Sequence, residues 1–151
     1  MKNELVYMKS QSMRNNLIFG GIEEGPEEKQ ADTEVKFREF LKSKLNLAQE
    51  LVTAMKIERA HRIGAHNQNG GNPRPRNIVC KFTEFKDRET ARKQGRQLKG
   101  TTFFISEQFP AEIMEARRRL LPKLNAAKQA GKRTWLVYDT LYVNGSPVTS
   151  D

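Results

Sequence analysis

Apolar positions along the chain change their spacing several times, and each change marks an expected structural element. Residues 17–22, LIFGGI, form a short apolar run followed by acidic residues, which predicts a first strand. From residue 32 to residue 47 the apolar positions recur at helical spacing, which predicts a helix with one buried face. Residues 54–63 alternate loosely between apolar and polar side chains and predict a second strand.

The next part of the pattern contains the clearest strand of the chain. Residues 76–85, RNIVCKFTEF, are rich in β-branched and aromatic side chains, and a Gly- and Asn-rich segment at 64–75 predicts a mobile loop before them. Polar helix-forming residues follow at 86–97, and TTFFI at 101–105 predicts a fourth strand. The expected order β-α-β-β-α-β is the split βαβ arrangement, in which two helices back a four-stranded antiparallel sheet.

A further helix and a turn signal follow this arrangement. Pro110 starts an apolar stripe of helical spacing that ends at Gly131, and Pro122 inside the stripe predicts a kink or a break. Residues 135–148, WLVYDTLYVNGSPV, predict one or two strands around a turn, with Asn144-Gly145 as a strong hairpin signal. The expected fold class is therefore α+β.

These elements divide the chain into three expected parts. Residues 15–109 form the four-stranded domain, and residues 110–151 form a C-terminal domain of one helix and a hairpin that is short or truncated. In residues 1–14, Leu5 and Met8 are the apolar positions of a weak heptad fragment. This segment is either the tail of a coiled coil that begins upstream or a frayed leader.

The composition narrows the class of partner. The chain carries 27 Lys and Arg against 18 Asp and Glu, with a net charge of +9 and a pI near 9.8. Such a balance favours nucleic acid, or less often an anionic membrane surface. No apolar run reaches the roughly eighteen residues of a membrane span. The single cysteine, Cys80, excludes an internal disulfide and is expected to pack in the core of an intracellular protein.

The sequence contains no recognisable catalytic constellation. His61 and His66 lie at a strand end and in the loop, and no Ser or Cys nucleophile is spaced to pair with either. No G-x-x-x-x-G-K-[ST] phosphate loop occurs, and the acidic cluster at 23–28 is typical of a solvated loop. We expect no enzyme, no cofactor and no metal, with an enzyme of nucleic-acid metabolism as the weaker alternative.

Basic residues concentrate between residues 56 and 99, whereas the first third of the chain is balanced or acidic. A lysine on a helix face is often only solvated, but the planar guanidinium of arginine binds phosphate through two hydrogen bonds and stacks on bases. This distribution predicts a nucleic-acid surface, extended by a cluster on the C-terminal helix. Its candidate residues are Arg59, Arg62, Arg74, Arg76, Lys81, Arg92, Arg96, Lys99, Arg117 and Arg118.

Strand alternation predicts which side chains face a ligand. The run LIFGGI fits the first strand of an RNA-recognition motif (RRM), a fit that turns Phe19 and, on the third strand, Cys80 toward the core. Four side chains would then face outward: Ile18, Asn77, Val79 and Lys81. Both stacking rings of the standard motif are therefore missing. The remaining rings that could stack on a base are Trp135, Tyr138 and Tyr142.

Six segments occur in an order that resembles the first-open-reading-frame protein of LINE-type non-LTR retrotransposons and the host proteins derived from it. They are RNNLIFGGIEE, RAHRIG, PRNIVCKF, LKGTTFFISEQFP, EARRRLLPKL and YDTLYVNG, and they cover residue 14 to about residue 145. The resemblance implies an RRM-like domain, a small C-terminal domain that completes a basic cleft, and a preceding coiled coil that trimerises the protein. It also implies RNA coating and nucleic-acid chaperone activity during target-primed reverse transcription.

Matched by position, the resemblance implies nucleic-acid contacts at Asn16, Arg92, Arg117, Arg118 and Tyr138. Ile18 stands where the family sometimes has arginine. The coiled coil is essentially absent from this chain, so we expect the chain alone to be monomeric and a homotrimer to need the upstream segment.

The sequence as a whole predicts a protein that binds and chaperones single-stranded RNA and DNA with little sequence specificity. The binding surface is expected to be a cleft between the sheet and the C-terminal segment, and the protein is expected in cytoplasmic ribonucleoprotein particles or in the nucleus, with no membrane partner. The alternative is a protein-interaction module that uses Ile18 and Val79 as exposed apolar contacts on a sheet without aromatic rings.

Overall fold

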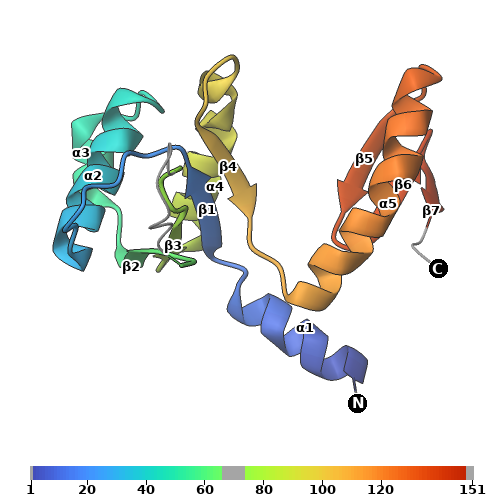
Figure 1. Ribbon diagram of the computed structural model, residues 1–151, viewed down its shortest axis with the longest axis horizontal. Coiled ribbons are helices and arrows are strands. Elements are labelled where there is room, and N and C mark those ends of the chain that lie inside the picture. The colour runs from blue at the N-terminus through green and yellow to red at the C-terminus, as the bar shows by residue number, and fades with distance from the viewer. Residues whose placement is uncertain (1, 66–73, 149–151) are drawn as a thin grey trace. The chain divides into compact units, whose positions relative to one another are not determined.

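In the computed structural model, which describes residues 2–65 and 74–148, the chain forms an α+β structure with two separate sheets (Figure 1). Backbone contacts divide it into two units. The first unit is Met13–Gln108, and the second combines Met1–Ser12 with Phe109–Asp151. Among the described residues, no helix has the length and apolar character that crossing a membrane requires.

The first unit contains the predicted four-stranded antiparallel sheet, with strand order β2-β3-β1-β4. Helix α2 packs on β2, and α4 contacts β1 and β3. The elements along the chain are β1 (Asn16–Gly20), α2 (Gln30–Ser43), α3 (Gln49–Ala54), β2 (Ile57–Arg62), β3 (Ile78–Phe82), α4 (Phe85–Lys93), the 3-10 helix η1 (Gln94–Leu98) and β4 (Phe104–Glu107).

The core of this unit lies between the helices and one face of the sheet. Phe19 is fully buried and meets the ring of Phe37 edge-on, with ring centroids 4.7 Å apart. Cys80 is also fully buried, and this burial raises the pKa of its thiol far above the usual range. Strand alternation predicted that both side chains point inward. Their complete burial confirms this orientation.

Most elements of the first unit begin or end a few residues away from the predicted bounds, and two differences have a clear physical reason. The short helix α3 was not expected, because its six residues are too few for a periodic signal, although Val52 is buried in the core. The fourth strand begins at Phe104 rather than at residue 101. The hydroxyl of Thr101 donates to the Leu98 carbonyl at 2.6 Å and accepts from the Phe103 amide at 3.2 Å, which holds this segment in a turn.

The second unit packs a long helix on a three-stranded antiparallel sheet of order β5-β6-β7 (Figure 1). The sequence predicted one or two strands, and the third forms because Asn144 (φ 51°) and Gly145 (φ 87°) both adopt left-handed backbone and reverse the chain. Its elements are α1 (Lys2–Ser12), α5 (Ala111–Gln129), β5 (Thr134–Val137), β6 (Thr140–Val143) and β7 (Ser146–Val148).

A kink or a break was expected at Pro122, and the break is absent because helix α5 continues through this residue. Proline removes the hydrogen bond to the carbonyl four residues earlier, which belongs to Arg118. Pro122 and Arg118 are both exposed, and water can therefore satisfy that carbonyl. Most of the predicted loop at 64–75, including His66, lies outside the described residues.

Candidate nucleic-acid interface

The sheet of the first unit has an outer face opposite its core, and its paired residues form rows across the strands. One row runs across β2, β3 and β1 to Gln108, the residue directly after β4, and is called the polar row. Arg59 pairs with Lys81, Lys81 pairs with Asn16, and the Asn16 side chain donates a hydrogen bond of 2.8 Å to Gln108 Oε1. Two cations and two amides thus lie side by side. Cations of this kind bind phosphates, and amides bind phosphates, sugars or base edges.

The cations of the polar row are only weakly neutralised. Lys81 Nζ lies 3.7 Å from Glu58 Oε1, and the two side chains are 46% and 57% exposed, so solvent screens the pair. Arg59 is exposed and makes no ion pair within residues 2–65 and 74–148. In the same described part of the chain, Asn16 Oδ1 is buried without a hydrogen-bond partner. The two exposed cations of this row can therefore accept an anionic ligand.

The next row on the outer face contains His61, Val79, Ile18 and Ser106. Val79 is only 4% exposed, so its predicted role as an exposed apolar contact is wrong. Its short side chain lies on a central strand, flanked by the larger His61 and Ile18. Burial, with a smaller contribution from the charge of Arg59, lowers the pKa of His61, which is therefore neutral at pH 7.

A third row places an aromatic ring on the outer face that the sequence analysis missed. Phe104 pairs with Gly20, and its side chain is 45% exposed. The standard stacking positions of the motif lie on the first and third strands, and they do not indicate a ring on the fourth. A sequence signal for this ring does exist: an aromatic residue on one strand and a glycine on the strand that pairs with it. The ring can lie over the glycine because glycine has no side chain.

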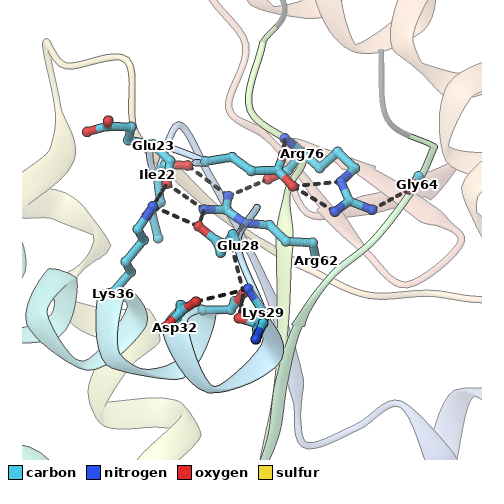
Figure 2. A network of polar contacts seen from close by, with 11 residues as sticks. Ile22, Glu23, Glu28, Lys29, Asp32, Lys36, Arg62, Gly64 and Arg76 are labelled. Carbon is cyan, nitrogen blue, oxygen red and sulfur yellow. Dashed lines mark hydrogen bonds and ion pairs between the residues drawn. The ribbon is translucent and has the colours of Figure 1, made fainter. Parts of the chain in front are cut away.

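Arg62 lies at the centre of a polar network, as Figure 2 shows. Its guanidinium donates to both oxygens of Glu28 at 2.7 and 3.1 Å, and to the carbonyls of Ile22, Glu23 and Arg76 at 2.7, 2.5 and 2.7 Å. The side chains of Arg62 and Glu28 are only 4% and 2% exposed. All five N–H donors of Arg62 are used inside the protein, so this predicted contact has none left for a phosphate.

Arg76 lies next to Arg62 and extends this network (Figure 2). Its guanidinium donates twice to Glu24 Oε2, at 2.9 and 2.7 Å, and once to the Gly64 carbonyl at 3.0 Å. We call Glu24, Glu28, Arg62 and Arg76 the arginine–glutamate network. It ties the segment after β1 to the end of β2 and to the start of β3. The acidic cluster predicted as a solvated loop thus supplies two structural carboxylates.

The network makes the stability of the fold depend on pH. Burial alone would raise the pKa of Glu28, but hydrogen bonds from Arg62, Lys36 and Thr33 outweigh it and hold this pKa far below its usual range. In the same way, the hydrogen bonds of Arg76 lower the pKa of Glu24 despite its burial. Both carboxylates are therefore ionised in the folded protein at neutral pH.

We expect the protein to lose stability on acidification through these two groups. A carboxylate with a lowered pKa stabilises the fold fully above its unfolded pKa, about 4.5, and the contribution disappears as the pH falls toward the folded value. Thermal unfolding followed by circular dichroism from about pH 7 to about pH 3 should show this loss. Glu28→Gln should start less stable and give a flatter profile, and parallel profiles would contradict the assignment.

Three further candidate cations lie along α4 and η1. Arg92 forms two hydrogen bonds to Glu89 through Nε and Nη2, each 3.0 Å long to its nearer oxygen. The bonds from Arg92, with those from Arg88, lower the pKa of Glu89 to about 2. The Arg92 side chain is still 43% exposed. Arg96 and Lys99 are exposed and make no ion pair among the described residues. The surface along α4 and η1, called the α4–η1 edge, therefore also carries positive charge.

The candidates of the second unit are partly used for packing. Arg117 donates to the Tyr138 carbonyl at 2.8 Å and lies over the Phe109 ring at 4.6 Å. Tyr138 occupies the turn between β5 and β6 with φ 55°, and its hydroxyl lies 2.6 Å from Ser10 Oγ. Arg118 pairs with Glu115, but its side chain is 71% exposed. Arg117 and Tyr138 thus hold a turn, whereas Arg118 faces solvent.

The structure therefore distributes the predicted site residues over distinct places. Asn16, Arg59 and Lys81 come together in the polar row, and Arg92, Arg96 and Lys99 follow the α4–η1 edge. Arg74 is exposed just before β3, while Arg62 and Arg76 belong to the arginine–glutamate network. Comparison of the sequence with protein-family models and with curated proteins finds no match.

Proposed function

We propose that this protein binds single-stranded RNA and DNA with low sequence specificity and acts as a nucleic-acid chaperone. The observation that carries the proposal is the polar row, in which Arg59, Lys81 and Asn16 cross three strands and Gln108 follows the fourth. An extended strand laid across this row would place phosphates against the cations and base or sugar edges against the amides. The net charge of +9 supports a polyanionic partner.

The finer architecture that we propose for the first unit is RRM-like. The strand order β2-β3-β1-β4 and the helices packed on one face support it, and they leave the opposite face for a ligand. Together with the six segments described above, this arrangement supports an origin in a LINE-type retrotransposon or a gene derived from one. The corresponding proposals are a ribonucleoprotein particle in the cytoplasm or nucleus and a homotrimer formed through an upstream coiled coil.

Low specificity and chaperone activity follow from the same surface. Contacts to phosphates carry no sequence information, and the standard aromatic positions hold Ile18 and Val79 instead of stacking rings. Cations that cover phosphates reduce the repulsion between two strands, so pairing partners can exchange while the protein stays bound. The protein-interaction alternative has less support, because Val79 is buried.

The test removes the two charges of the polar row together. Arg59→Gln with Lys81→Gln is expected to weaken binding of a fluorescent single-stranded RNA about tenfold and uniformly across sequences. Fluorescence anisotropy measures the affinity, and thermal unfolding should be nearly unchanged because both side chains are exposed.

A matched control removes two lysines from the helical side of the same unit. Lys42 and Lys44 lie at the C-terminal end of α2, so Lys42→Gln with Lys44→Gln changes the net charge by the same amount. The control should retain most of the affinity. Equal losses of affinity in the two double variants would show that net charge alone, and not the polar row, determines binding. An unchanged affinity in the Arg59 and Lys81 variant would exclude the polar row as the binding surface.

A further inference from the structure

The Phe104 ring lies on the outer face of the sheet, above the backbone of β1. A Cβ atom built at Gly20 would fall 2.0 Å from Phe104 Cε1 and 2.3 Å from its Cζ. Since Phe19 points into the core, residue 20 points outward, and the ring occupies the space that a side chain there would fill. Glycine at this position therefore provides a flat support for the ring, whose side chain remains 45% exposed.

Phe104 also lines a cleft at the edge of the sheet, between β4 and the α4–η1 segment. The cleft has a volume of about 540 Å³, within the range of small-ligand sites. Two cationic residues, Arg92 and Lys99, line it together with Phe104 and Ser106. We call it the Phe104 cleft. Its lining thus brings two cationic residues to the sheet edge that also carries Phe104.

One carboxylate, Glu107, also lines the cleft, but its charge is offset. Arg88 Nη2 donates to Glu107 Oε1 at 2.9 Å. Arg92 is partly neutralised by Glu89, whereas Lys99 makes no ion pair among the described residues. The cleft therefore keeps a positive character that suits a phosphate at the β4 edge of the sheet.

We propose that Phe104 stacks on one base of a bound single strand that passes around the edge strand β4, where Arg92 and Lys99 hold phosphates next to that base. This inference rests on the proposed function and deepens it, because it assigns a base-stacking subsite on the fourth strand. Stacking on an aromatic ring needs no particular base, so the subsite adds affinity and favours unpaired nucleotides without adding sequence preference. A paired base is already stacked within its duplex and is not available to the ring.

The experiment compares a single-stranded RNA with an abasic oligomer that carries the same number of phosphates. The unmodified protein is expected to bind the RNA about tenfold more tightly than the abasic oligomer. Phe104→Leu should lose most of this preference and keep its affinity for the abasic oligomer. Phe104→Trp should retain the preference, because it keeps an aromatic surface.

Phe85 provides the matched control, because its side chain is similarly exposed, at 40%. The guanidinium groups of Arg14 and Arg88 already lie over its ring, at 4.6 and 5.4 Å. Phe85→Leu should therefore leave the preference for bases unchanged. Circular dichroism of each variant checks that it is folded.

The outcomes separate this inference from the function on which it rests. Failure of the unmodified protein to bind either oligomer would overturn the proposed function itself. Binding with a base preference that survives in Phe104→Leu would overturn the subsite alone, as would equal binding of the two oligomers by the unmodified protein. Loss of the preference in both Phe104 variants would show that packing over Gly20, rather than stacking on a base, is what the ring contributes.

Discussion

Arg62→Met is expected to lower the free energy of unfolding by about 3–5 kcal/mol, the cost of breaking a buried ion pair from one side. The substitution keeps an apolar side chain of similar length, but it removes all five N–H donors that Arg62 contributes to the arginine–glutamate network. Glu28 retains Lys36 at 2.8 Å and Thr33 at 2.6 Å, which favours the lower end of this range. Three backbone carbonyls lose a partner at the same time.

Arg59→Met is the control for this change, because it makes the same replacement on the same strand but on the outer face. Arg59 is exposed and makes no ion pair among the described residues, so its loss should alter stability by no more than about 0.5 kcal/mol. Urea unfolding of the three proteins gives the comparison. Equal stability of Arg62→Met and the unmodified protein would show that the network is not structural.

The two variants should behave in the opposite way toward RNA. Arg62 has no donor left for a phosphate, so folded Arg62→Met is expected to keep the affinity of the unmodified protein for a single-stranded RNA. Arg59→Met should weaken it about fivefold or more. This reversal would separate the arginines that hold the fold from those that hold the ligand, a distinction that residue type alone does not make.

The inward and outward residues of the strands were predictable because strand periodicity is a local property. The orientations of Phe19 and Cys80 follow from alternation within a few residues, and both are confirmed. The four-stranded antiparallel sheet was predictable for a related reason. The apolar runs are short and separated by turn signals, which restricts how they can pair.

The roles of the arginines were not predictable, because they depend on contacts between distant segments. Arg62 meets Glu28, which lies 34 residues away, and a charge pattern does not show which cation finds a carboxylate. Burial of Val79 likewise depends on its neighbours His61 and Ile18 from two other strands. Phe104 was predictable in one respect and not in another. Its strand follows from the local sequence pattern, whereas its position over Gly20 arises only from the pairing of β4 with β1.

The affinity for single-stranded RNA is expected to fall about a thousandfold between about 50 and 200 mM salt. Each phosphate contact on a single strand contributes about −0.7 to the slope of log affinity against log salt. Seven of the ten candidate cations are exposed in the structure. They are Arg59, Arg74, Lys81, Arg92, Arg96, Lys99 and Arg118. If each contacts one phosphate, the slope of log affinity against log salt is about −5.

This slope also tests the division among the arginines. If Arg62, Arg76 and Arg117 contacted phosphates as well, all ten candidates would count and the slope would approach about −7. Arg59→Gln with Lys81→Gln removes two of the contacts and should reduce the slope to about −3.5. Anisotropy titrations over a series of salt concentrations measure the slopes of the unmodified protein and of this double variant. A slope near zero would exclude phosphate neutralisation as the basis of binding, because affinity without counterion release does not depend on salt in this way.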